Sequence, residues 1–501
     1  MFARPLAVLA LSLCAAGPAQ SSSQASIEAA APYEARRISP ESAVRDVEIL
    51  ARVLSDVHPG YDRYTSREAM DAMLDALRDR VAEGGISDEE LYREVSLILA
   101  RIRCDHTKAE LPDAIEAHRK SVPSYLPFAF RVLEGRMIVE AAAAAEGVGL
   151  RRGDEVLSIN GRSVPDLIAG VEPYLAVDGW TDNAKRAELE YSTELLGGAI
   201  ENFWPMLYGW PEGWTVKARS ENGTDRSLEL PMLTWEENRA LLERGPGSDD
   251  YNFDTSVRHE MLDETTAYLR IGTFVNYRRN ANVGELFEPI FAGFAEAGAE
   301  RLIVDLRDCG GGSDGPPNFL FSYLIDRPFR LSAARPWVRN ASYPEDLSSL
   351  LGTWDRSVFD RPASFYRDLG NGFYEVGSGG VARARPRPDR FEGDVIVLVG
   401  PQNASGATHL LARLKTARPD VVFVGEPTGG SAEGCTAGIM FFVELPASGV
   451  VARVPLYRQF INASGFAPGR GVEPDVYATQ TVEGFRAGRD DVLEAALRLG
   501  R

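Results

Sequence analysis

Three short runs of apolar and β-branched residues in the second half of the chain constrain its fold most strongly. They read "RLIVDLR" at 301–307, "DVIVLVG" at 394–400 and "VVFVG" at 421–425. A helix-like segment precedes the first run, and another separates the second run from the third. Strand–helix–strand repetition implies parallel pairing with right-handed crossovers. We therefore predict an α/β sheet within residues 263–501, with any site outside the carboxyl ends of its strands.

Two other units precede this sheet. Residues 39–120 have helical periodicity, including a capping-box pair at Ser87 and Glu90. Residues 121–234 contain a strand, tight turn and strand in "FAFRVLEGRMIVEA", and then "GVGLRRGDEVLSINGRSV", which resembles the signature of a PDZ domain. A long aromatic-rich insertion without an assigned structure interrupts this unit, and a polar linker over 235–262 follows it. The sequence thus predicts a multi-domain α/β protein.

The amino terminus has the pattern of an export signal. Arg4 precedes an apolar run that is too short to span a bilayer, and small residues follow it. We predict a signal peptide at 1–19, a flexible lead-in at 20–38 and a periplasmic or secreted location. Cys14 offers lipid attachment as an alternative, which the bulky Leu13 before it disfavours. No later segment has about 20 uninterrupted apolar residues, so no membrane span is expected.

Charge and cysteine content exclude further classes. With 54 basic and 73 acidic residues the net charge is −19, so the chain offers no basic stripe and nucleic acid is not an expected partner. Three cysteines remain after the signal, an odd number that argues against a disulfide framework. There is no CxxC pair and no HExxH, so neither a metal nor a cofactor is expected. Nothing in the sequence predicts an oligomeric state.

Two turns after predicted strands carry the residues with catalytic potential. Ser405 in "VIVLVGPQNASGATHLLARLK" stands at a helix start, where free N–H groups and the positive end of the dipole meet. Gly406 follows it with an unobstructed amide, and "DLRDCGGGSDG" at 305–315 offers further N–H groups able to hold an oxyanion. A serine at a helix start is also an ordinary cap, so both readings of Ser405 stay open.

A nucleophilic serine needs a base, and the local sequence does not supply one. Lys415 lies nearly three turns further along the same predicted helix. His409 lies one turn after Ser405 and is more typical of a packing residue. His106, next to Asp105 in "RCDHTKAEL", is distant in sequence and on its own is an unremarkable loop residue.

Six short motifs in a fixed order resemble one serine-peptidase superfamily, that of the carboxyl-terminal processing peptidases, the tricorn-core peptidases and the interphotoreceptor retinoid-binding protein repeats. They are "DHT", "GLRRGDEVLSING", "YLRIGTF", "VDLRDCGGG", "VLVGPQNASGATHLL" and the pair "VVFVGEPTGG" and "GRGVEPDV". Each is weak alone, but their order is specific, and the similarity covers roughly residues 40–480. The resemblance implies a ββα crotonase-like core that binds peptide or protein substrates.

The resemblance also implies roles for individual residues. One branch of the superfamily takes its base from a lysine at a position that is Gly430 here, which excludes Ser–Lys chemistry. The tricorn-like branch uses a histidine that matches His106. Ser405 is then the nucleophile, His106 the base, and the amides of Gly406 and of Gly311 or its neighbour form the oxyanion hole. The catalytic residues that the resemblance implies are therefore Ser405 and His106, with Glu473 as a tentative orienting acid.

The sequence departs from the family at two places. The asparagine of the family's "DLR" loop is Cys309 here, and the acid that orients the histidine is missing from its expected position. Glu473 is a tentative replacement, and Glu426 and Glu433 compete with it. We therefore predict an exported serine peptidase that cleaves unstructured or C-terminal peptide segments through an acyl-enzyme. The alternatives are a non-catalytic peptide- or lipid-binding protein on the same fold, and a crotonase-like acyl-CoA enzyme.

Overall fold

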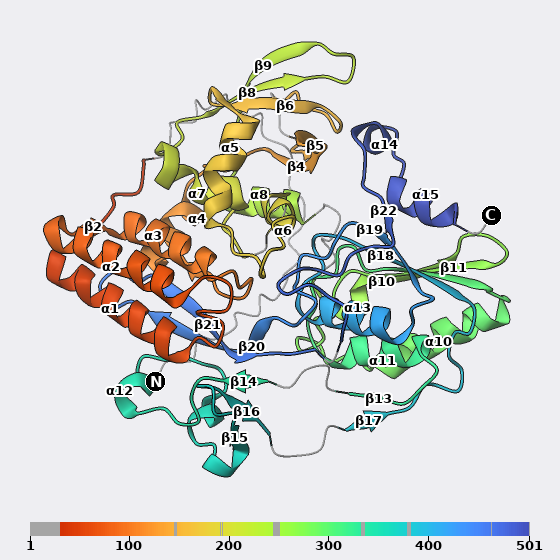
Figure 1. Ribbon diagram of the computed structural model, residues 1–501. Helices are drawn as coiled ribbons and strands as arrows, with labels where there is room; N and C mark the ends of the chain where they lie inside the picture. Colours follow the sequence, from red (N-terminus) through yellow and green to blue (C-terminus); the bar gives the residue numbers. More distant parts are fainter. Residues whose placement is uncertain are drawn as a thin grey trace, which may run out of the picture.

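The computed structural model describes residues 31–144, 148–190, 192, 194–243, 251–331, 336–377, 382–461 and 463–499. The predicted signal peptide at 1–19 and the first part of the predicted lead-in lie outside these residues. Within the described ranges, no helix combines the length and apolar character that crossing a membrane requires. Three six-stranded sheets, two small two-stranded sheets and the helices between them make up the described part of the chain (Figure 1).

The amino-terminal unit is helical, as the periodicity predicts. The predicted capping box forms, because the Ser87 side chain accepts from the Glu90 amide while the Glu90 carboxylate accepts from the Ser87 amide. The helices pack on one another and on a strand of the third sheet, which joins this unit to the rest of the protein. They are α1 (Pro40–Val57), α2 (Arg67–Gly84), α3 (Asp88–Arg101) and α4 (Asp113–Ser121).

The second unit is an antiparallel sheet with the order β4-β5-β6-β8-β9. The predicted strand–turn–strand is confirmed as β4 and β5, and the insertion that had no assigned structure is helical. The strands are β4 (Phe128–Leu133), β5 (Arg136–Ala142), β6 (Glu155–Ile159), β8 (Trp214–Arg219) and β9 (Asp225–Leu230). The insertion contains α5 (Val164–Val171), α6 (Ala184–Glu190) and α7 (Ala199–Tyr208).

The central sheet has the order β10-β11-β12-β18-β19-β22, and all its neighbours after β10 are parallel, as predicted. Its strands are β10 (Val257–Met261), β11 (Thr266–Ile271), β12 (Arg301–Asp305), β18 (Asp394–Val399), β19 (Val422–Gly425) and β22 (Val476–Tyr477). Apolar side chains of α10 (Val283–Glu296), α11 (Gly315–Leu324) and α13 (Ser405–Ala417) cover one face, and α15 (Asp491–Leu497) covers the other.

The predicted linker at 235–262 is wrong for much of its length. It contains α8 (Trp235–Leu242) and α9 (Phe253–Ser256), and its last residues form β10. Strand β10 pairs antiparallel with β11 at the edge of the central sheet, and its middle residues, Arg258 to Glu260, are exposed. A polar, exposed edge strand has the composition of a loop, which is why the sequence pattern missed it.

A third sheet connects the helical unit to the central sheet. Its order is β15-β16-β14-β21-β20, and β3 pairs with β21. It contains an antiparallel hairpin of β20 (Thr436–Glu444) and β21 (Val451–Arg458). Its other strands are β3 (Ala109–Glu110), β14 (Trp337–Val338), β15 (Tyr366–Asp368) and β16 (Tyr374–Val376). Strand β3 lies just after His106, so its pairing carries the "DHT" loop toward the central sheet.

Candidate active site

Ser405 lies on the turn that joins the end of β18 to the start of α13. The buried side chain of Asn403 organises this turn: its Oδ1 accepts from the Gly400 amide (2.9 Å), and its Nδ2 donates to the carbonyls of Leu306 and Cys309 (3.2 Å to Cys309). These bonds tie the turn to the segment after β12. The ends of two adjacent parallel strands thus form one platform, at the edge where sites of α/β sheets lie.

Ser405 is not the cap of its helix, although the sequence allowed that reading. The N-cap is Ala404, which has no capping side chain, and Ser405 is the first helical residue with φ of +45°. A side chain at positive φ is uncommon and costs of the order of 1–3 kcal/mol where the surroundings impose it. Such strain is concentrated at functional sites, and here it falls on the one residue that the motif comparison singles out.

The glycine loop after β12 packs directly against this turn. An ideal Cβ on Gly311 would lie 2.7 Å from the Gly406 nitrogen and 3.0 Å from Ser405 Cβ, so only glycine fits there. The Gly311 amide faces the Cys309 sulfur. The Gly312 nitrogen lies 3.5 Å from the position of a Cβ on Gly406, so the amides of Gly312 and Gly406 are neighbours. They form the pair best placed to hold an oxyanion.

His106 is held on the loop between α3 and β3. The Thr107 amide donates to the Cys104 carbonyl (3.0 Å), and the Thr107 hydroxyl bonds to Nε2 of His58 (2.7 Å). The Cys104 thiol donates to the carbonyl of Thr436 (3.3 Å), at the start of β20. The loop is therefore anchored to both the helical unit and the third sheet. His106 Nδ1 is buried and has no hydrogen-bond partner in the described structure.

Asp178, in the helical insertion before α6, lies behind His106. Its Oδ1 accepts from the Asp105 amide (3.0 Å), while its Oδ2 is buried and has no partner among the described residues. One ligating atom each of Asp178, His106 and Cys104 lie within 4.8 Å of one another. Burial and the neighbouring Asp105 carboxylate raise the pKa of Asp178, and the proximity of His106 acts in the opposite direction. Asp178 was not predicted from the sequence because no local pattern marks it.

Cys435 and His409 connect the serine to the histidine loop. The Cys435 side chain is hydrogen-bonded to the Ser405 side chain, and Cys435 Sγ lies 3.5 Å from His409 Nε2. Burial, and then the charge of His106, lower the pKa of His409 to about 3. Ser405 and His106 make no direct hydrogen bond in the described structure, but both border this cluster. Catalytic hydrogen bonds are often long in enzymes without substrate, so the arrangement is compatible with a Ser–His pair.

The acids that the sequence proposed lie elsewhere. Glu473 is exposed, and its carbonyl accepts from Lys415 Nζ (2.6 Å). Lys415 is ten residues, or about 15 Å, along α13 from Ser405, so Glu473 lies near the opposite end of that helix. Glu426 and Glu433 each pair with an arginine, at 2.6 and 2.9 Å. The structure therefore brings Asp178, and none of these glutamates, to His106.

Gly430, which occupies the position of the family's lysine, faces the serine turn. A Cβ there would lie 2.5 Å from Thr408 Oγ1 and 3.0 Å from the Ala404 Cα. Any larger side chain at this position would have to displace the start of α13. This packing agrees with the exclusion of a lysine base made from the sequence.

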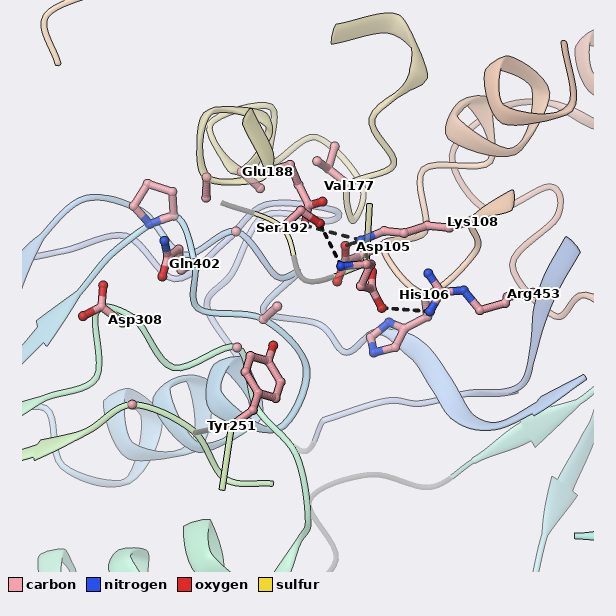
Figure 2. Close-up of a pocket in the computed structure, with 18 of the residues that line it drawn as sticks. Asp105, His106, Lys108, Val177, Glu188, Ser192, Tyr251, Asp308, Gln402 and Arg453 are labelled. Atoms are coloured by element: carbon pink, nitrogen blue, oxygen red, sulfur yellow. Dashed lines mark hydrogen bonds and ion pairs between the residues drawn. The ribbon is translucent and has the colours of Figure 1, made fainter. Parts of the chain in front are cut away.

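A cavity of about 290 Å³ separates the two loops (Figure 2). His106 lines it, and so does Ala404, the residue before Ser405. Lys108 on its wall contacts three carboxylates at 2.6–3.4 Å, which raise the pKa of the lysine well above its usual value although burial disfavours its charge. Lys108 is thus held protonated and is no base. The other charged lining residues are Asp105, Glu188, Glu194, Asp308 and Arg453.

Comparisons with known proteins show a similar family model and similar folds. Residues 265–478 match the model of "Peptidase family S41". Mature CPAF in complex with lactacystin is similar in structure, with a TM-score of 0.61, 17% identity and coverage of 89% of this chain and 95% of that one. Mature CPAF alone matches with a TM-score of 0.60, 18% identity and coverage of 89% and 94%. No curated protein matches the sequence.

The parallel sheet, the strained serine turn and the family match together define the class of protein, which is a serine-type peptidase. The matched segment contains the glycine loop, Ser405 and strands β11 to β22. This segment of the chain is similar to the S41 peptidases.

Proposed function

We propose that the protein is an exported peptidase that cleaves unstructured or C-terminal peptide segments, with Ser405 as nucleophile, His106 as general base and Asp178 as the acid that orients His106. The observation that carries the proposal is the strained turn of Ser405 against the glycine loop, with His106 lining the cavity that Ala404 of this turn also lines, and with the buried carboxylate of Asp178 close to His106. This is the constellation that acyl transfer requires.

The proposed reaction uses only side chains and amides of the chain. Ser405 Oγ attacks the scissile carbonyl and gives its proton to His106 Nε2. The amides of Gly406 and Gly312 stabilise the oxyanion. His106 returns the proton to the leaving amine, and water, deprotonated by the same nitrogen, releases the acid product and frees Ser405. Asp178 Oδ2 accepts from His106 Nδ1 and stabilises the imidazolium.

The other basic groups near Ser405 are unsuited to this role. Lys108 is held protonated by three carboxylates. His409 has a pKa lowered to about 3, so it drives proton abstraction at neutral pH poorly.

The second unit supports a peptide substrate. Its antiparallel sheet, with helix α5 beside it, is compatible with the PDZ-like signature in the sequence, and PDZ domains bind peptide ends by strand addition. Together with a ββα crotonase-like core, this gives a protein that binds a chain terminus and cleaves nearby. The signal-like segment at 1–19 supports a periplasmic or secreted location. Peptides with a free carboxylate should be cleaved faster than the same peptides with an amidated end.

Replacement of the nucleophile is the decisive test. Ser405→Ala should lower the hydrolysis of an unstructured peptide by at least about 10³-fold and abolish covalent labelling by a fluorophosphonate. Lactacystin, which occupies the CPAF structure, is a second probe. Ser349→Ala, an exposed serine at the end of helix α12 (Glu345–Ser348), is the matched control and should keep both properties. Full hydrolysis by Ser405→Ala would refute the proposal.

The rival function is a non-catalytic carrier of peptide or lipid. The absence of a direct Ser405–His106 hydrogen bond in the described structure favours it. The walls of the cavity oppose a lipid, because six charged side chains and His106 line it. Co-purified lipid together with no labelling of Ser405 would favour the carrier.

A further inference from the structure

Three side chains with metal-ligating atoms meet behind the proposed base. Cys104 and His106 come from the loop after α3, and Asp178 comes from the insertion in the second unit. One ligand atom of each lies within 4.8 Å of the other two. A thiolate sulfur, an imidazole nitrogen and a carboxylate oxygen are the donors that Zn²⁺ binds in proteins.

Two of these three groups lack a partner. His106 Nδ1 and Asp178 Oδ2 are buried and make no hydrogen bond in the described structure. Asp178 is only 2% exposed. A buried polar atom without a partner costs about 1–3 kcal/mol. A metal cation between these two side chains would engage both atoms at once.

The ligand positions are set by bonds between the two loops. The Gly179 amide donates to the Arg103 carbonyl (3.0 Å), and Arg103 Nη1 donates to the Gly179 carbonyl (2.8 Å). The Asp105 amide holds the other oxygen of Asp178 (3.0 Å). These bonds place the carboxylate opposite the histidine without a ligand, so only small side-chain shifts are needed to enclose an ion.

We propose that Cys104, His106 and Asp178 form a regulatory site for a thiophilic divalent cation, with Zn²⁺ as the type ion, and that its occupation switches the peptidase off. Binding deprotonates the Cys104 thiol and releases that proton to solvent. The thiolate and the Asp178 carboxylate balance the charge of the ion. Imidazole binds through Nδ1 and keeps its proton on Nε2.

Inhibition follows from the chemistry of the bound histidine. With a proton on Nε2 and the metal on Nδ1, His106 cannot accept the proton of Ser405. The ion also takes the two atoms that would form the catalytic His106–Asp178 hydrogen bond. Metal binding and catalysis thus compete for one histidine. The inhibition rests on the proposed Ser–His function, whereas the binding of the ion does not.

The test is a titration of the full chain with Co²⁺ under reducing conditions. A thiolate–cobalt charge-transfer band should appear with one ion per chain and should be absent in Cys104→Ser. Cys309→Ser, which removes a different buried thiol, is the matched control and should keep the band. Asp178→Asn keeps the thiol and should weaken cobalt binding by at least about 10-fold.

The second readout is peptide hydrolysis at increasing Zn²⁺, with each variant normalised to its own zinc-free rate. The concentration for half-inhibition should rise by more than about 100-fold in Cys104→Ser, since even outer-shell changes cost 10–100-fold in metal affinity. A missing band in the wild type, or an unchanged band in folded Cys104→Ser, overturns the metal site. A cobalt band without any peptidase activity would retain the site and refute the proposed function instead.

Discussion

Replacement of Asp178 by asparagine tests whether the charge of this proposed orienting acid contributes to catalysis. The change keeps the size of the side chain and removes its charge. At a separation of 4.8 Å, the upper bound between the ligating atoms, and an effective dielectric constant of about 20, a carboxylate stabilises an imidazolium by about 3.5 kcal/mol. We therefore expect kcat to fall by about 300-fold, because each 1.36 kcal/mol corresponds to a factor of ten.

The assay is steady-state hydrolysis of a fluorogenic unstructured peptide across pH. For Asp178→Asn, kcat should fall while KM changes little, and the acid limb of kcat/KM should move to lower pH, because the His106 imidazolium loses its counter-charge. Asp182→Asn is the matched control: this exposed carboxylate on the same loop pairs with Arg103 at 3.3 Å. Such a surface pair contributes at most about 1 kcal/mol. An Asp178→Asn enzyme within about threefold of wild type, with an unmoved pH profile, would refute the assignment.

Three other predictions concern the packing and charges around the site. Gly311→Ala should destabilise the fold by about 3 kcal/mol in urea unfolding and abolish activity, because its φ of +105° and a Cβ 2.7 Å from the Gly406 nitrogen both oppose a side chain; a normal midpoint would contradict this. Burial, the largest cause in each case, lowers the pKa of His58 and of His409 to about 3 from an ordinary 6.5. Between these two pKa values the unfolded chain binds more protons than the folded chain, so the stability that the two neutral histidines allow is complete above pH 6.5 and is lost as pH falls. The free energy of unfolding should therefore be lower at pH 5 than at pH 8 by about 2 kcal/mol per histidine. Equal stability at both pH values would exclude buried neutral histidines. Lys108→Met should lower stability by about 1–2 kcal/mol, since it removes the cation that three partly exposed carboxylates share, and a fully stable variant would show that the network is dispensable.

Several features of the fold were predictable because their signals are local. Apolar runs mark β12, β18 and β19, and helix periodicity between them requires parallel strands. The capping box of α3 needs only four consecutive residues. Strand β10 was not predicted because its exposed residues are polar and because only its pairing with β11 makes it a strand.

The residues of the candidate site also differ in whether a local sequence signal marks them. Ser405 and the glycine loop follow strands directly, so sequence reasoning could place them at the carboxyl edge of the sheet. His106 required the order of motifs, since its own surroundings in sequence are ordinary. Glu473 was proposed from a motif position, but it lies by the far end of α13.

The sequence by itself determined the parallel pairing of the central strands, the nucleophile candidate, and the absence of a lysine at position 430. Only the tertiary structure decided the φ of Ser405 and the meeting of Asp178 with the Cys104–His106 loop. The physical reason is range: periodicity and caps arise from contacts between residues a few positions apart. The hydrogen bond from Asp105 to Asp178 joins residues 73 positions apart, and it forms only after two separate units have packed against one sheet.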